Sequence, residues 1–217
     1  MRARLRRLRG VLAIALWLGC AAGSHPSAPG AEEAHFAPSG FLGDYSALRA
    51  GGKNRARLVY LDANADFSGY ERVLIEPVVV WKSDEARFAG VPPAQREALA
   101  REFDTELHRS FAEGFAVADS AGSGTLRVRT ALSAAIADDT DPGRPQYIEV
   151  ELELRDAVTN ARLAAAVDSK GTVPSRAHQD PQAVETRAAF QDWAERVAAR
   201  VAALRDLDRQ QLQPETR

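Results

Sequence analysis

The chain has 217 residues, of which 45% are hydrophobic and 27% are charged, a composition that suits one globular domain. Its formal net charge of −2 is the sum of two parts of opposite charge, because residues 1–19 hold five arginines and no acidic residue. The rest of the chain then carries 23 basic against 30 acidic side chains, a net charge of −7. An acidic domain without a basic stripe repels phosphates, which argues against nucleic-acid partners and against binding an anionic membrane by charge alone.

The N-terminus has the three-part layout of an export signal. Five arginines precede an apolar run over residues 11–18, and small residues follow it. The apolar run would make roughly 15 Å of helix, about half of what a bilayer core requires. It therefore predicts a signal peptide over residues 1–19 that is removed, rather than a permanent transmembrane helix.

Cys20 is the only cysteine, so it cannot form an internal disulfide. Its place at the end of the apolar run resembles the lipobox of bacterial lipoproteins, in which the cysteine is acylated and becomes the first mature residue, although Trp17 and Leu18 depart from the usual pattern. The alternative is an ordinary cut after Ala22, which would leave a secreted periplasmic protein. Ala21, in place of aspartate, implies sorting to the outer membrane with the domain facing the periplasm. Several acyl chains would make that membrane anchoring stable.

Three further segments follow the cysteine. Residues 20–38 are rich in glycine, serine and proline, which is typical of a flexible tether. The folded domain is expected over residues 39–207. Residues 208–217 are polar and are expected to form a C-terminal tail.

The first half of the domain predicts a strand and a helix. The β-branched run within Tyr70–Trp81 indicates a strand, and Pro77 inside it places that strand at a sheet edge or a bulge. A helix is expected from Pro92 and Pro93 to Gly114, and a short strand over residues 115–119. The apolar face of this helix has residues four apart: Leu99, Phe103, Leu107 and Phe111.

The second half predicts three strands and a final helix. Residues 126–132 and 148–155 alternate apolar and charged side chains, as half-buried strands do, with the charged groups facing solvent. If they pair antiparallel across a loop at 138–145, arginines of the first can face glutamates of the second. A turn at 156–161, with Asn160 suited to the left-handed conformation, leads to a strand over 162–168.

Asp180 and Pro181 are typical of the start of the final helix. Its apolar stripe consists of Phe190, Trp193, Val197, Val201 and Leu204. The order of elements predicts an α+β fold: a single domain with a mostly antiparallel sheet of four to five strands and two helices packed on one face.

Six segments in a fixed order resemble one bacterial family. They are Ser39–Ser46 (SGFLGDYS), Tyr60, Tyr70–Trp81, Gly124–Arg129, Leu154–Leu163 and Phe190–Ala194. The set is similar to the lipoproteins grouped as "domain of unknown function 3313" and spans about residues 39–204. Asn160 stands where the family typically has glycine, and both residues tolerate the left-handed conformation. The resemblance implies a lipoprotein and supplies no reaction.

The sequence offers few groups for catalysis or for binding a metal or cofactor, and none of either is expected. Acylation of Cys20 leaves no thiol, and Ser123 between two glycines indicates a turn before a strand rather than a nucleophile elbow. The four histidines are dispersed, and only His108 has a carboxylate, Asp104, one helical turn away. An acidic hairpin around Asp138 lacks the ligand spacing of a calcium loop.

The aromatic segment with Phe41, Leu42 and Tyr45 directly follows the tether. It suggests either a strap that covers the core or an exposed site for docking a partner. Covering is preferred because large apolar groups near a domain edge usually pack.

The leading hypothesis is a lipid-anchored cell-envelope protein without enzymatic activity, an accessory or assembly factor that contacts periplasmic or outer-membrane proteins. The alternative is a domain that binds a small ligand or lipid in a pocket between sheet and helices. A third possibility is a hydrolase that uses His108 with nearby carboxylates.

Overall fold

The computed structural model describes residues 38–212, apart from 54, 83–84, 139–140 and 172–183. The predicted signal peptide, Cys20 and nearly all of the tether lie outside the described residues. So do Asp180 and Pro181, the expected start of the final helix; the helix that the structure describes begins later, at Thr186.

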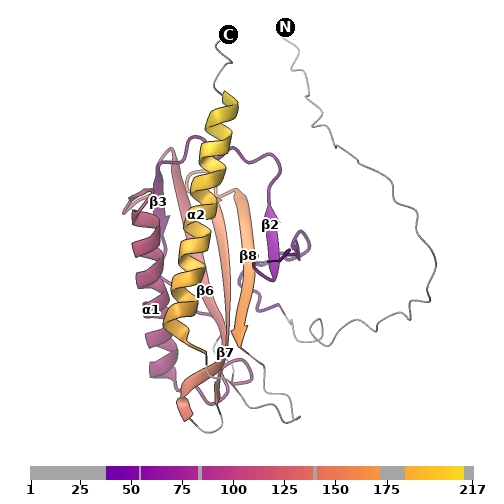
Figure 1. The fold of residues 1–217 in the computed structure, drawn as a ribbon, viewed down its shortest axis with the longest axis vertical. Coiled ribbons are helices and arrows are strands. Elements are labelled where there is room, and N and C mark those ends of the chain that lie inside the picture. Colours follow the sequence, from indigo (N-terminus) through magenta and orange to yellow (C-terminus); the bar gives the residue numbers. More distant parts are fainter. Residues whose placement is uncertain (1–37, 54, 83–84, 139–140, 172–183, 213–217) are drawn as a thin grey trace, which may run out of the picture. The chain divides into compact units, whose positions relative to one another are not determined.

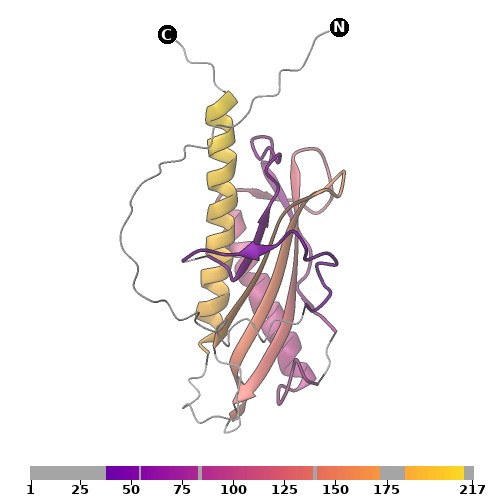
Figure 2. The ribbon, with the colours of Figure 1, turned by 90° about the vertical axis from the view of Figure 1, so that its right-hand side faces the viewer.

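The domain is built on one sheet with two helices on one of its faces (Figures 1 and 2). Neighbouring strands follow the order β1-β2-β8-β7-β6-β3-β5, and β4 pairs with β6 beyond the end of β3. The elements are β1 (Arg49–Ala50), β2 (Leu58–Leu61), β3 (Arg72–Ile75), β4 (Val79–Val80), α1 (Pro93–Ala112), β5 (Ala116–Val117), β6 (Thr125–Asp138), β7 (Asp141–Asp156), β8 (Arg162–Gly171) and α2 (Thr186–Leu212).

The α+β class is confirmed, but the sheet is larger than predicted and mixed. Eight strands replace the expected four to five. The long strands β6, β7 and β8 pair antiparallel, whereas β3 runs parallel to both β5 and β6 and β4 parallel to β6. The parallel pairs arise because α1 carries the chain back along the sheet before β5 and β6 begin.

The strand expected over Tyr70–Trp81 is two short strands. Pro77 has no N–H to donate to a neighbouring strand, and β3 ends before it while β4 begins after it. The expected edge position holds for β4, which pairs with β6 alone among the described strands, and does not hold for β3, which lies between β5 and β6.

The expected loop at 138–145 is mostly strand. β6 continues to Asp138, β7 begins at Asp141, and the register shifts between Leu132 and Ala134 and again near Ala137. Such bulges let two long strands follow the sheet's twist beyond the strictly alternating part of the sequence. The turn before β8 is confirmed, with Asn160 at a φ of 60°.

The predicted apolar faces of both helices meet the sheet and each other. Leu99, Phe103, Leu107 and Phe111 of α1 are all buried. The ring of Phe103 stacks on Phe190 of α2 with 4.9 Å between centroids. Further along α2, Val201 is buried, while Val197 and Leu204 are partly buried against the core.

The second helix continues through residues 208–212, which were expected in the tail. The carboxylate of Asp208 accepts a hydrogen bond from the Phe67 backbone N–H at 2.8 Å, and Arg209 donates to the Ser68 carbonyl at 2.8 Å. Among the described residues, no helix is long and apolar enough to span a membrane.

Candidate functional site: an ionic layer beneath an N-terminal strap

Three glutamates of β7 are buried on the sheet face opposite the helices. Glu149, Glu151 and Glu153 are 3%, 0% and 0% exposed, and the residues between them belong to the helix-side core. The prediction that these charged side chains face solvent was wrong. The alternating pattern correctly places the glutamates on the face opposite the apolar core. It does not show that another segment of the chain covers that face.

The two outer glutamates are neutralised by arginines. Glu149 receives hydrogen bonds from Arg57 at 2.9 Å and Arg87 at 3.3 Å, and also from the hydroxyls of Ser133 and Tyr147 at 2.9 and 3.1 Å. Burial, followed by the charge of Glu149, raises the pKa of Tyr147 to about 12. This end of the layer is a satisfied polar network.

Glu153 is held by three arginines: Arg129, Arg155 and Arg162. Arg129 lies directly across from it on β6, so the expected facing of arginine and glutamate is confirmed at this pair. Arg127 lies across from Arg155 instead. We call Glu149, Glu151, Glu153 and the arginines that bind them the ionic layer.

Glu151, in the middle of the layer, has no ion pair within the described ranges. Its neighbours across the two ladders are Ala131 on β6 and Val167 on β8, both fully buried. Its Oε2 accepts a hydrogen bond from the Tyr45 hydroxyl at 2.5 Å. Its Oε1 is buried and has no hydrogen-bond partner among the described groups.

Residues 39–46, here called the strap, pack on the ionic layer. Phe41 is 7% exposed and Leu42 is 3% exposed. The Phe41 ring meets Trp81 edge to face at 5.3 Å, and the Arg129 guanidinium lies 5.2 Å from the Phe41 centroid. Phe41 and Leu42 are therefore placed as expected for a strap that covers the domain, and not as exposed residues of a docking site.

Side chains of the domain also bind the strap's backbone. The Trp81 indole N–H donates to the Ser39 carbonyl at 3.1 Å. Arg162 donates to the carbonyls of Leu42 and Asp44 while it binds Glu153. One arginine thus joins the strap to the ionic layer.

The hydroxyl of Tyr45 connects the strap to Glu151. It accepts hydrogen bonds from the backbone N–H groups of Gly40 at 3.0 Å and Leu42 at 3.2 Å, and it donates to Glu151. Burial and the bond to Glu151 raise the pKa of Tyr45 above its ordinary value. The sequence singled out Tyr45 but missed Glu151. No local signal marks Glu151, because its neighbours across the two ladders are Ala131 and Val167 and its partner lies on the strap.

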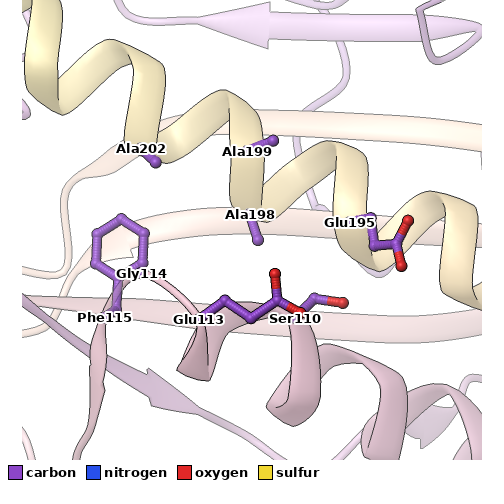
Figure 3. Close-up of a pocket in the computed structure, with 8 residues that line it drawn as sticks. All are labelled: Ser110, Glu113, Gly114, Phe115, Glu195, Ala198, Ala199 and Ala202. Atoms are coloured by element: carbon purple, nitrogen blue, oxygen red, sulfur yellow. The ribbon is translucent and has the colours of Figure 1, made fainter.

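A surface hollow of about 350 Å³ lies elsewhere, between the C-terminal half of α1 and α2 (Figure 3). Small side chains leave this gap: the lining residues are Ser110, Glu113, Gly114, Phe115, Glu195, Ala198, Ala199 and Ala202. Ser110 is 4% exposed, and its hydroxyl has no partner among the described residues. At the rim, Arg109 pairs with Glu113 at 3.5 Å and Glu195 at 3.0 Å.

His108 does not meet a second carboxylate in a cleft. Its Nδ1 lies 3.5 Å from Asp104, and that carboxylate accepts the Val78 backbone N–H at 3.1 Å. No group of three or more metal-ligating side chains comes together among the described residues. The arrangement is a helix-surface pair with a structural role for Asp104.

The profile of the family described as "Protein of unknown function (DUF3313)" matches residues 37–197. The chain belongs to this family. The sequence resemblance is confirmed, and the DUF3313 match includes the whole strap and all three glutamates of the ionic layer. Among curated proteins, none matches the chain.

Two solved structures are similar to this DUF3313 chain at low sequence identity. The PelC dodecamer from Paraburkholderia phytofirmans is 12% identical, with 68% of this chain and 96% of that chain covered and a TM-score of 0.36. A Xanthomonas campestris protein of the DUF330 family is 16% identical, with 70% and 91% covered and a TM-score of 0.39.

Proposed function

We propose that this DUF3313 protein is a lipid-anchored component of the bacterial cell envelope that works by binding other envelope proteins, as an accessory or assembly factor, and not by catalysis. The observation that carries the proposal is that the buried glutamates are all bound by other side chains of the domain. Glu149 and Glu153 are each bound by arginines, and Glu151 by a strap hydroxyl. Carboxylates held in this way support a structural role rather than general acid or base chemistry.

The anchor proposal rests on Cys20 and on the segment that follows it. Acylated at Cys20, the chain would be held to the outer membrane and would project into the periplasm. Residues 21–38, fully extended, reach at most roughly 60 Å. The strap begins at the end of this segment, so the tether would join the domain on the ionic-layer side of the sheet.

The hollow between α1 and α2 is the surface that best suits a protein partner. Ala198, Ala199 and Ala202 allow a partner's side chain to approach the backbone of α2 closely. One or two projecting side chains of an envelope protein would fill the volume. A contact of this size suits a transient or multi-point interaction.

A small ligand or lipid between sheet and helices is the weaker alternative. The space between these layers is occupied by buried side chains such as Phe103, Phe190 and Trp193, which contact one another. The hollow lies between the helices instead. Its small, partly polar lining suits side chains better than an acyl chain.

The anchor is tested by metabolic labelling with an alkyne analogue of palmitate followed by membrane fractionation. We expect wild-type protein to be labelled and to fractionate with the outer membrane, and Cys20→Ser to lose both properties. The control restores a cysteine elsewhere, in the double variant Cys20→Ser, Ser24→Cys, which should remain unlabelled. Equal labelling of wild type and Cys20→Ser would refute the anchor.

The docking surface is tested by a photo-crosslinking amino acid placed at Ala199 in cells. Ala188 is the matched control, because it is an exposed alanine of the same helix that does not line the hollow. A discrete adduct with an envelope protein from position 199 alone supports the proposal. Equal adducts from both positions, or none from either, would contradict it.

A further inference from the structure

Glu151 is an unusual residue for the middle of a sheet. A fully buried carboxylate without a cation loses its hydration and gains little in return. The single hydroxyl of Tyr45 supplies its one hydrogen bond, and Oε1 has none within the described structure. Two positions away on the same face, Glu153 has three arginines.

The strap packs over Glu151 on the sheet face opposite the helices. Tyr45 is bonded to Glu151, Phe41 covers Arg129 next to it, and the neighbours across the ladders are the apolar residues Ala131 and Val167. If the strap lifts, Glu151 regains hydration while the β6–β7–β8 ladders stay paired. The free-energy cost of burying this carboxylate is therefore a cost of closing the strap, not of folding the sheet.

Other contacts favour the closed strap. Phe41 and Leu42 lose apolar surface on opening, and Arg162 and Trp81 lose the backbone carbonyls that they bind. These contacts stabilise the closed strap, and the buried carboxylate of Glu151 destabilises it. The free-energy difference between the open and closed strap is therefore smaller than the burial of Phe41 and Leu42 alone would give.

We propose that the strap is a releasable cover on the sheet, and that the unpaired carboxylate of Glu151 sets how readily it opens. Opening uncovers the ionic layer and breaks the hydrogen bonds that Arg162 and Trp81 donate to the strap backbone. Under the anchor proposed above, it also adds the eight strap residues to the tether, which extends its reach by roughly 27 Å. Strap opening itself does not depend on the anchor.

Hydrogen exchange measured by mass spectrometry on the purified mature protein tests the proposal. In the wild type, we expect strap amides such as those of Gly40 and Leu42 to exchange at least about ten-fold faster than the β6–β7 ladder amides, which shows opening without global unfolding. Glu151→Gln keeps the shape and an acceptor for Tyr45 but removes the charge. It should slow strap exchange by about five-fold or more.

Two further variants should change the rate of strap exchange in the opposite direction to Glu151→Gln. Tyr45→Phe removes the last hydrogen bond to Glu151, and it also removes the acceptor of the Gly40 and Leu42 amides. It is therefore read at Gly43 and Asp44, whose N–H groups bind backbone carbonyls, and these amides should exchange about ten-fold faster while the ladders stay protected. Glu153→Gln is the matched control: the same chemical change on the same face of β7, at a carboxylate that arginines do neutralise. It should accelerate exchange in both strap and sheet.

Either of two results would overturn the proposal. One is strap exchange that is unchanged or faster in Glu151→Gln, since the carboxylate would then not oppose closure. The other is wild-type strap exchange as slow as that of the ladders, since the strap would then open only when the protein unfolds. Neither measurement depends on lipid labelling of Cys20, so failure of the anchor and failure of the strap are distinguishable.

Discussion

At the scale of single residues, the glutamates of β7 have the same side chain but different partners. Glu149 sits among two arginines and two hydroxyls, whereas Glu151 meets one hydroxyl and two apolar neighbours. Removal of the charge from the first would take away the carboxylate that Arg57 and Arg87 bind, which is costly. Removal of the charge from the second relieves a cost. The same substitution therefore has opposite expected effects at neighbouring sites.

Tyr147 links this network to stability at high pH. Its pKa is about 12 in the folded protein, because burial and the charge of Glu149 oppose ionisation, against about 10 in the unfolded chain. The folded state thus holds this proton more tightly. The stabilising contribution is complete below pH 10 and is lost as the pH rises from 10 towards 12.

In Tyr147→Phe, we expect the free energy of unfolding to fall less steeply between pH 10 and 12 than in the wild type. Urea unfolding at several pH values measures this slope. Data at pH 8 serve as the reference, because Tyr147 is protonated there in both states and the difference gives the cost of the lost hydrogen bond to Glu149. Parallel slopes in the two proteins would contradict the assignment.

At the scale of elements, a buried arginine fixes the start of α1. Arg96 is 5% exposed, and its guanidinium donates to the carbonyls of Val91 at 2.6 Å and Phe88 at 3.2 Å. It also lies 5.0 Å from the Phe88 ring centroid. The loop before the helix is thereby tied to the first helical turn, where Pro93 supplies no N–H.

Arg96→Met should lower the free energy of unfolding by about 2–4 kcal/mol, because two buried carbonyls lose a charged donor. Its ion pair with Glu85 contributes little, since that carboxylate is largely exposed. Thermal or urea unfolding gives the value. Arg101→Met, an exposed arginine of the same helix, is the control and should change stability by less than about 0.5 kcal/mol. Similar losses in both variants would refute this role.

At the scale of the whole molecule, the last turns of α2 hold the loop that precedes β3. Asp208 binds the Phe67 backbone N–H, Arg209 binds the Ser68 carbonyl, and Arg209 also pairs with Glu71 at 3.1 Å. Phe67 is almost completely buried, so this loop belongs to the core although it lies some 140 positions away in sequence.

A chain that ends after Leu207 should lose about 2–4 kcal/mol of stability, because both charge-assisted contacts to the loop disappear. A chain that ends after Leu212 keeps them and should unfold at nearly the wild-type temperature. Calorimetry of the two truncations against the full mature chain compares them directly. Equal stability of the two truncations would show that residues 208–212 do not support the domain.

The sequence by itself determined the elements with strong periodicity: both helices, the alternating parts of β6 and β7, the turn at Asn160 and the α+β class. These follow from local patterns of apolar residues and from backbone preferences. The short strands β1 and β2 were missed, since two to four residues carry no period. The family was also recognisable, because its segments keep their order along the chain.

Only the tertiary structure decided where β3 and β4 lie, how many strands join the sheet, and what covers its second face. Strand order and parallel pairing depend on the path of α1 over the sheet, which no local pattern encodes. Glu149, Glu151 and Glu153 alternate with apolar residues along β7, and this local pattern predicts exposure to solvent. Their burial depends on arginines from loops and from other strands, and on a strap more than a hundred residues earlier in the chain. Only the fold brings these groups together.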